Sequence, residues 1–384
     1  MDQNSVFSFK GKMDSIQVLR ACLAFLIFLS HFECLSRYNL SAPVFLFYTI
    51  SGFVVMLSTR KKDKVKGFLK RRFIRLLPLY WTVTIFTFVA AQINSSFMSY
   101  TPSFIQLLKS MFCIPFSRDT IVNSHTTMRP IVGPAHTLEV EIIFSIVFFI
   151  CMLISHKHRG KIVSGVCLSF FLIGECFNIL NINLNIDFIE FYIIHNRVAW
   201  LYFFTGVVIF KIFEYAESKA VQISSLKKYF VFSISFAVII FTVINVLHNR
   251  MSSDVYYSLQ ALAGFLTLSF LIILSQYHIK MPRFLVYFGD ISFSFYLLHY
   301  YIVHITEKVL HVQSIDWILL IAVIVAFGVS LLVASVSYYI FEKKIPKLLL
   351  NNKKTRWLIS RGYGLWLLPS KPCQASSREC LHRG

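Results

Sequence analysis

The strongest constraint on this chain is a succession of apolar segments, each of a length that suits a lipid bilayer. A membrane-spanning helix needs roughly 20 mostly apolar residues. The sequence therefore predicts an all-α fold, that of a polytopic membrane protein with about ten transmembrane helices. The predicted spans are 16–34, 42–59, 77–93, 137–154, 163–181, 198–213, 229–247, 257–275, 285–305 and 315–340.

The composition agrees with this prediction. Hydrophobic residues make up 56% of the chain and charged residues 15%, whereas a soluble domain has about 25% charged residues. The first apolar segment has the length of a signal peptide. However, it contains Arg20 and His31 and lacks a small-residue cleavage site, so we expect it to be retained as the first helix.

The net charge of +20 is distributed unevenly between the two sets of loops. With ten spans, the loops on the side of both termini hold 20 Lys and Arg, and the opposite loops hold seven. The positive-inside rule then places both termini in the cytoplasm. This placement explains most of the surplus by contact with membrane lipid, so we expect no nucleic-acid partner.

Two regions differ from the apolar spans. Residues 351–384 are basic, mix Trp with Ser and Pro and have no helical period, which predicts a disordered tail after a membrane domain of residues 1–350. The tail is alternatively sequence foreign to the domain. The connection 94–136 is long enough to cover the outer face of a site. None of the eight Cys forms a CxxC pair, so we expect no metal site.

Arg20 and His31 are basic residues of the first predicted helix, and they lie eleven residues apart. At about 100° per residue they project from one face, roughly 16 Å apart along the axis. This face offers a cation for an anionic donor at one end and a titratable base at the other. Alternatively, both side chains extend to the two headgroup regions without a function.

Further ionisable residues occur in or beside the apolar segments. Arg71 and Arg75 are four residues apart and are predicted to face the same way, as a phosphate site or as an anchor on anionic lipid. Glu141 lies one turn inside the segment 137–154, where Thr137 is expected to cap the helix. The buried ninth segment holds His299, for which a neutral, hydrogen-bonded state is the common arrangement.

Two caps and two further titratable residues belong to the same ninth segment. Asp290 and Ser292 are expected to cap its beginning. His304 and Glu307 lie near its outer end.

Six motifs in order resemble those of the acyltransferase 3 family. Together they extend over nearly the whole chain up to about residue 350. They are I-Q-V-L-R-A-C-L-A-F-L-I-F-L-S-H (16–31), Y-T-I-S-G-F-V (48–54), F-L-K-R-R-F-I-R-L-L-P-L-Y-W (68–81), H-T-L-E-V-E (136–141), G-D-I-S-F-S-F-Y-L-L-H (289–299) and Y-Y-I-F-E-K-K (338–344). His136 and Phe293 depart from the usual Trp and Tyr of these motifs.

The resemblance implies a bacterial inner-membrane O-acyltransferase with no tightly bound cofactor. Such enzymes move an acetyl or other short acyl group from acetyl-CoA to a hydroxyl of a surface polysaccharide or lipid-linked oligosaccharide, such as the O-antigen of lipopolysaccharide or an exopolysaccharide. The residues that match its functional positions are His31, Glu141 and Arg20 as catalytic residues, and Arg71, Arg72, Arg75, Ser51 and Gly52 as donor-binding residues.

Some roles stay open at this level. His31 is expected to act as general base on a sugar hydroxyl or as a relay for the acyl group. Glu141 is expected to orient or charge-balance either His31 or an arginine. A transporter or flippase of a lipid-linked sugar or acyl group would also use buried charges and a basic face. Breakdown of acetyl-CoA by the purified protein would separate the enzyme from this alternative.

Overall fold

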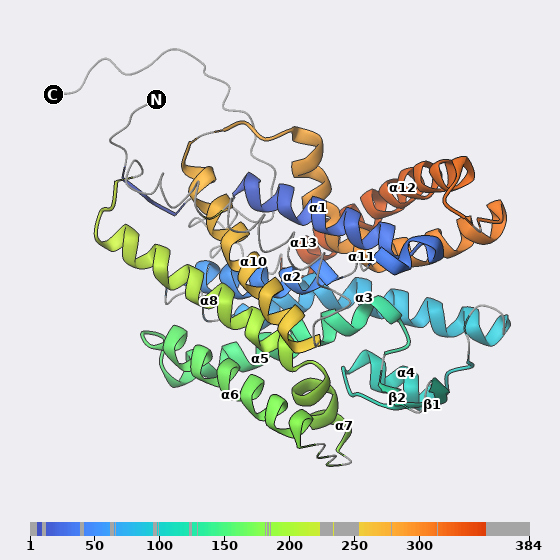
Figure 1. Cartoon of the computed structure of the whole chain (residues 1–384), viewed down its shortest axis with the longest axis horizontal. Coiled ribbons are helices and arrows are strands. Elements are labelled where there is room, and N and C mark those ends of the chain that lie inside the picture. Colours follow the sequence, from blue (N-terminus) through green and yellow to red (C-terminus); the bar gives the residue numbers. More distant parts are fainter. Residues whose placement is uncertain are drawn as a thin grey trace.

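The structure is a computed structural model, and it shows a bundle of helices (Figure 1). It describes residues 6–9, 13–38, 42–61, 65, 67–94, 98, 100–122, 125–128, 130–180, 182, 184, 186–222, 233, 253–277, 279–312 and 314–350. The longer helices are α1 (Asp14–Ser30), α2 (Leu46–Ser58), α3 (Phe68–Ile93), α5 (His136–Ile154), α6 (Arg159–Ile179), α8 (Arg197–Ser218), α10 (Ser253–Leu274), α11 (Arg283–Leu310) and α12 (Trp317–Ser337).

Shorter elements connect these helices. They are the 3-10 turns η1 (Glu33–Tyr38), η2 (Ala42–Phe45), η4 (Gly133–Ala135) and η7 (Ser275–Tyr277), the helices α4 (Phe104–Met111), α7 (Asp187–Ile189) and α13 (Ile345–Leu350), the π-helical segments η5 (Glu190–His195) and η8 (Tyr338–Lys344), and the strands β1 (Ser117–Val122) and β2 (His125–Met128). The strands form an antiparallel hairpin, so the fold is mainly helical rather than purely so.

Nine of the ten predicted spans fall on helices, and the tenth, 229–247, lies outside the described residues except for Ser233. Within the described part, six helices are long and apolar enough to cross a membrane. The count of ten is therefore not confirmed. Helices α1 and α2 have 17 and 13 residues, fewer than the roughly 20 that a bilayer requires. Helix α11 has 28 residues, but polar side chains interrupt its apolar sequence.

Helix α12 shows which kinds of residue face the bundle and which face outward. Its buried positions include Ala322, Ala326, Ser330 and Ala334, which recur every four residues and present small side chains to the bundle. The opposite face exposes large apolar side chains such as Leu332, which is 70% exposed. A helix with a small, buried face and a large, exposed apolar face is typical of a span that packs on protein on one side and on lipid on the other.

Close backbone contacts hold two helix pairs together. At Gly206 in α8, an added Cβ would lie 2.1 Å from the backbone oxygen of Thr49 in α2. At Gly289 in α11, an added Cβ would lie 2.0 Å from the oxygen of Gln17 in α1. Because neither site has room for a Cβ, α2 packs directly on α8 and α1 on α11, which lie side by side in Figure 1.

Two sequence predictions about helix beginnings were wrong. Helix α3 starts at Phe68 rather than near residue 77, so the basic segment is its first turns. Helix α11 starts at Arg283, which places Asp290 and Ser292 inside it instead of at its cap. In addition, Thr137 does not cap α5, since its hydroxyl donates to the oxygen of Pro134.

Candidate functional site

One polar group of residues lies among α1, α2, α3, α5, α11 and η8, and we call it the arginine–carboxylate cluster. It consists of Arg20, Ser51, Arg72, Arg75, Glu141, Ser294 and Glu342. Charged residues inside an apolar bundle are costly unless they are paired, so their pairing pattern shows which charges are satisfied within the protein.

Arg72 is the best-paired arginine of the cluster. Its Nη2 atom forms an ion pair with Oε1 of Glu141 and donates to Oγ of Ser51 at 3.0 Å. The hydroxyl of Ser51 in turn donates to the same Glu141 oxygen at 2.8 Å. The Arg72 and Glu141 side chains are 17% and 28% exposed. This triangle joins α2, α3 and α5, and in it the Glu141 carboxylate contacts an arginine, while the catalytic role of Glu141 stays a prediction.

Arg75 pairs with a second carboxylate. Its Nε lies 3.7 Å from Oε2 of Glu342, and Oγ of Ser294 donates to the other Glu342 oxygen at 2.8 Å. Glu342 is only 3% exposed because the π-helical η8 turns it inward. The buried positions step by five residues from Ser337 to Glu342, where an α-helix would step by three or four.

Arg20 completes the cluster without a direct carboxylate partner among the described residues. Its one hydrogen bond goes to Oε1 of Gln17 at 3.4 Å on its own helix. Its electrostatic neighbours are Arg75, Glu342, Glu141 and Asp290. A guanidinium that is close to other arginines and lacks a bonded carboxylate is the group in this cluster best suited to an external anion.

The other predicted donor-binding residues take different positions. Arg71 is exposed on α3, whereas Arg72 and Arg75 have carboxylate partners in the cluster. Gly52 faces α8, and an added Cβ there would lie 2.4 Å from the oxygen of Phe203. The contact of Gly52 is thus with a neighbouring helix, and its part in donor binding stays a prediction.

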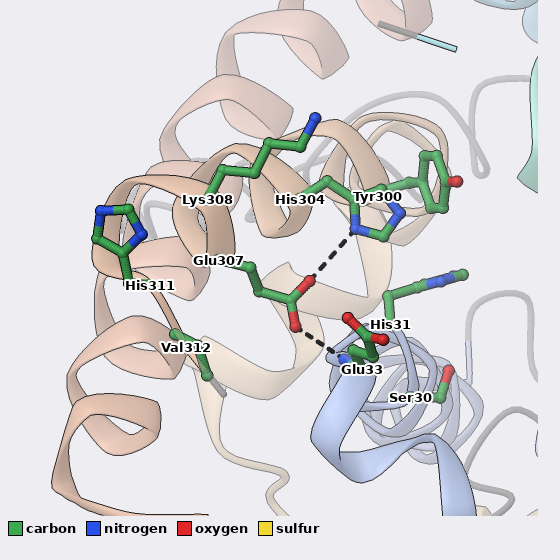
Figure 2. A pocket seen from close by; sticks show the side chains of 9 residues that line it. All are labelled: Ser30, His31, Glu33, Tyr300, His304, Glu307, Lys308, His311 and Val312. Carbon is green, nitrogen blue, oxygen red and sulfur yellow. Dashed lines mark hydrogen bonds and ion pairs between the residues drawn. The ribbon is translucent and has the colours of Figure 1, made fainter. Parts of the chain in front are cut away.

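A pocket of about 660 Å³ lies where the C-terminal ends of α1 and α11 meet (Figure 2). We call it the histidine pocket. It is lined by Ser30, His31, Glu33, Tyr300, His304, Glu307, Lys308, His311 and Val312. Glu307 organises one wall, since one carboxylate oxygen accepts from the backbone N–H of Glu33 at 2.7 Å and the other lies 3.4 Å from Nδ1 of His304.

His31 borders this pocket at the C-cap of α1. Its ring centroid lies 5.1 Å from those of both His299 and Tyr300 on α11. His304 and His136 are also among its electrostatic neighbours. Four imidazoles from three helices thus gather here. Within the described residues, no group of three or more His, Cys, Asp or Glu side chains is arranged to hold a metal ion.

The two predicted residues of the first helix therefore lie in different polar environments. Arg20 belongs to the arginine–carboxylate cluster, and His31 lines the histidine pocket. Glu342 was not predicted as a partner of Arg75. Its signals in the sequence were a place in the motif at 338–344 and a position directly after the last apolar span, where an acid is ordinarily exposed to solvent.

The connection 94–136 is tied to α3 and α5, and none of its described residues lines the histidine pocket. The hydroxyl of the buried Tyr80 contacts both Oε1 of Glu139, at 2.7 Å, and the backbone oxygen of Ser110, at 2.8 Å. The indole of Trp81 donates to the oxygen of Met111 at 2.8 Å. These bonds anchor α4 beside α3, as Figure 1 shows.

Comparison with known proteins supports an acyltransferase. The chain is 27% identical over 136 residues to "Exopolysaccharide production protein ExoZ" of Rhizobium meliloti (strain 1021). That alignment covers 35% of this chain and 41% of the relative, so less than half of either protein is compared. No solved structure is significantly similar to the chain.

A family match extends much further along the sequence. Residues 13–339 match the family described as "Acyltransferase domain". The matched range contains the whole histidine pocket and every residue of the arginine–carboxylate cluster except Glu342. Several apolar helices and this match make the chain a multi-pass membrane protein. The chain belongs to the acyltransferase 3 family of membrane acyltransferases.

Proposed function

We propose that this protein transfers an acetyl group from cytosolic acetyl-CoA to a hydroxyl of a surface polysaccharide sugar, such as that of an O-antigen or exopolysaccharide. The observation that carries the proposal is the position of α1, which connects the two polar sites. Arg20 belongs to the arginine–carboxylate cluster at one end, and His31 lines the histidine pocket at the other. An extended pantetheine arm is of a length to bridge the roughly 16 Å between them.

The donor binds on the side of the arginines. Arg20 has no bonded carboxylate among the described residues, and Arg75 is 42% exposed, so these guanidiniums are suited to phosphate oxygens. Arg71 adds positive charge on the exposed side of α3. Arg72 has a different part in this proposal, because its Nη2 is engaged with Glu141 and Ser51 and holds three helices around the donor.

The acceptor enters the histidine pocket. Carboxylates and imidazoles at its wall are acceptors and donors for sugar hydroxyls, and the ring of Tyr300 offers an apolar face. His31 takes the proton of the attacking hydroxyl as the ester C–O bond forms and the thioester C–S bond breaks. The proton ends on the coenzyme A thiolate, so the products are the acetyl ester and free coenzyme A.

This proposal places the chain in a bacterial inner membrane with both termini in the cytoplasm. The support is the excess of Lys and Arg in alternate loops. Reporter fusions at the ends of the chain and in the connection 94–136 test the orientation. Equal labelling of these sites by a membrane-impermeant reagent would contradict it.

Release of coenzyme A by purified protein in proteoliposomes tests the chemistry. Radiolabelled acetyl-CoA is supplied on the side of the arginines, with surface polysaccharide from a strain that lacks the gene on the other side. Acetyl ester on the glycan and thiol release in equal amounts are expected. Movement of a labelled sugar without thiol release would instead indicate a transporter. Mass spectra of surface glycan from the deletion strain and its parent identify the acceptor.

A further inference from the structure

The buried imidazole of His299 has one nitrogen whose role is set by the backbone. Its Nδ1 lies 2.9 Å from the carbonyl oxygen of Phe295, four residues earlier on α11. Because a carbonyl only accepts hydrogen bonds, Nδ1 carries the hydrogen. In the neutral ring, Nε2 then carries a lone pair and is an acceptor. His299 is fully buried, and its Nε2 has no hydrogen-bond partner among the described residues.

Among the described rings in contact with His299, one is left to serve that lone pair. The rings of Phe295 and Phe28 lie at 5.4 and 6.2 Å. Tyr296 lies at 5.9 Å, but its hydroxyl already contacts Thr137 and the oxygen of Pro134. The remaining neighbour is His31, whose ring centroid lies at 5.1 Å. An unsatisfied buried acceptor is costly, so a donor at this position would stabilise it.

His31 is able to supply the donor. Its side chain makes no hydrogen bond within the described part of the chain, and it lies between His299 and the open pocket. Two imidazole nitrogens that point toward each other across a centroid separation of 5.1 Å come within hydrogen-bonding distance, about 2.9 Å. A turn of the His31 ring about its side-chain bonds closes this contact.

We propose that His299 is a positioning residue for His31: its buried Nε2 accepts a hydrogen bond from one nitrogen of His31 and directs the other nitrogen into the histidine pocket. This inference rests on the proposed acyl transfer, in which that second nitrogen takes the hydroxyl proton. His31 then becomes an imidazolium. The nitrogen that faces His299 keeps its hydrogen and its hydrogen bond to the neutral His299, and the proton on the other nitrogen leaves for the thiolate. His299 keeps its own hydrogen on the carbonyl of Phe295 throughout.

Two substitutions separate this role from packing. The amide of His299→Asn reaches the position of Nδ1 and keeps the donor to Phe295, but it leaves nothing at the position of Nε2. The longer His299→Gln places an amide oxygen, which accepts hydrogen bonds, near the position of Nε2. Positioning predicts that Gln restores what Asn loses, whereas filling of space alone predicts no such difference.

The first readout is the rate at which diethyl pyrocarbonate modifies His31, measured by peptide mass spectrometry on the purified full chain. The lone pair of a neutral imidazole nitrogen attacks a carbonyl carbon of the reagent, and the exposed His158 serves as the internal reference. His31 in the unmodified chain is expected to react at least as fast as His158, although it is less exposed. A reaction of His31 more than about tenfold slower than that of His158 would overturn the proposal. Because this measurement uses the unsubstituted chain, it does not depend on the folding of any variant.

The second readout is the kinetics of acetyl-CoA turnover. His299→Asn is expected to lower kcat and the reactivity of His31 by roughly five- to tenfold with little change in KM, and His299→Gln to stay within about twofold of the parent. Equal losses in both variants at an unchanged melting temperature, or no loss in either, would overturn the positioning role. Absence of turnover in the unsubstituted protein would contradict the proposed function instead, and the reactivity of His31 would still test the His31–His299 contact.

Discussion

The arginine–carboxylate cluster and the histidine pocket solve the problem of polar groups in an apolar bundle in opposite ways. In the cluster, Arg72 and Arg75 each have a carboxylate partner, and serine hydroxyls occupy further oxygens. In the pocket, His31 has ring neighbours but no hydrogen bond within the described residues, and the nearby His299 keeps an unpaired nitrogen. Paired charges stabilise helix packing, whereas unpaired imidazoles are free to exchange protons. The cluster should therefore govern stability, and the pocket should govern the rate of reaction.

The largest expected effect is on activity, from His31→Ala. Removal of a general base typically lowers a rate by about 10²- to 10⁴-fold, and we expect glycan acetylation to fall accordingly. The melting temperature should change little, because the side chain makes no hydrogen bond within the described residues. Acetyl ester on surface glycan and protein abundance in membranes are measured together. His158→Ala, at the beginning of α6, is the matched control. Full acetylation in His31→Ala would remove the pocket from the mechanism.

The next effect is on stability, from Glu141→Gln. It leaves Arg72 mostly buried without its ion-pair partner, which should cost about 2–3 kcal/mol, less than a fully buried pair because both side chains are partly exposed. Thermal unfolding in detergent measures the change. Replacing Arg72 by Met and Glu141 by Leu together should cost less than the single change. A Glu141→Gln protein as stable as its parent would contradict the stabilising role of the pair.

A smaller effect links the two regions through the contact between α1 and α11. In Gly289→Ala the new Cβ would lie 2.0 Å from the oxygen of Gln17, and the resulting shift should cost about 1–3 kcal/mol. Gly328→Ala on α12 is the control, since nothing lies within 4 Å of its new Cβ. We expect the control to be neutral or stabilised by about 0.5–1 kcal/mol in thermal unfolding. Equal stabilities of the two variants would mean that α1 and α11 move apart around the new Cβ at little cost.

The smallest effect is expected from the exposed Arg71. Arg71→Gln should raise KM for acetyl-CoA by roughly two- to threefold at low ionic strength, and added salt should reduce the difference, because exposed charges are screened within about 10 Å at 0.1 M. The melting temperature should not change. Lys161→Gln removes the same charge from a different exposed segment. If both variants raise KM equally, the contribution of Arg71 is general attraction rather than a local contact.

Sequence patterns were most informative where a single helix decides the result. Nine of the apolar segments do form helices, as predicted. The eleven-residue spacing predicted the separation of Arg20 from His31 because a helix has a fixed rise and turn. The neutral, hydrogen-bonded state expected for His299 also agrees with its bond to Phe295.

Features that depend on several helices were not predictable in the same way. Helical spacing paired Arg71 with Arg75, but the direction of the bundle interior puts Arg72 beside Glu141 instead. That choice depends on how α3 meets α2 and α5, which no local pattern contains. The beginnings of α3 and α11 were displaced because tertiary packing extends both helices through polar residues that would otherwise favour ends.

The wide turn of η8 decides which side chain faces the bundle after α12. From Ala322 to Ser337 the buried positions are small residues, and the five-residue step then brings Glu342 into the next inward place. If the same residues formed an ordinary α-helical turn, all that follows would be rotated by about 100°, and the inward place four residues after Ser337 would go to the phenyl ring of Phe341. Arg75 and Ser294 would then face a hydrocarbon, although every residue that bonds them was still encoded. The one extra residue in the turn thus sets the rotation of the chain after α12, so that Glu342 faces Arg75 and Ser294.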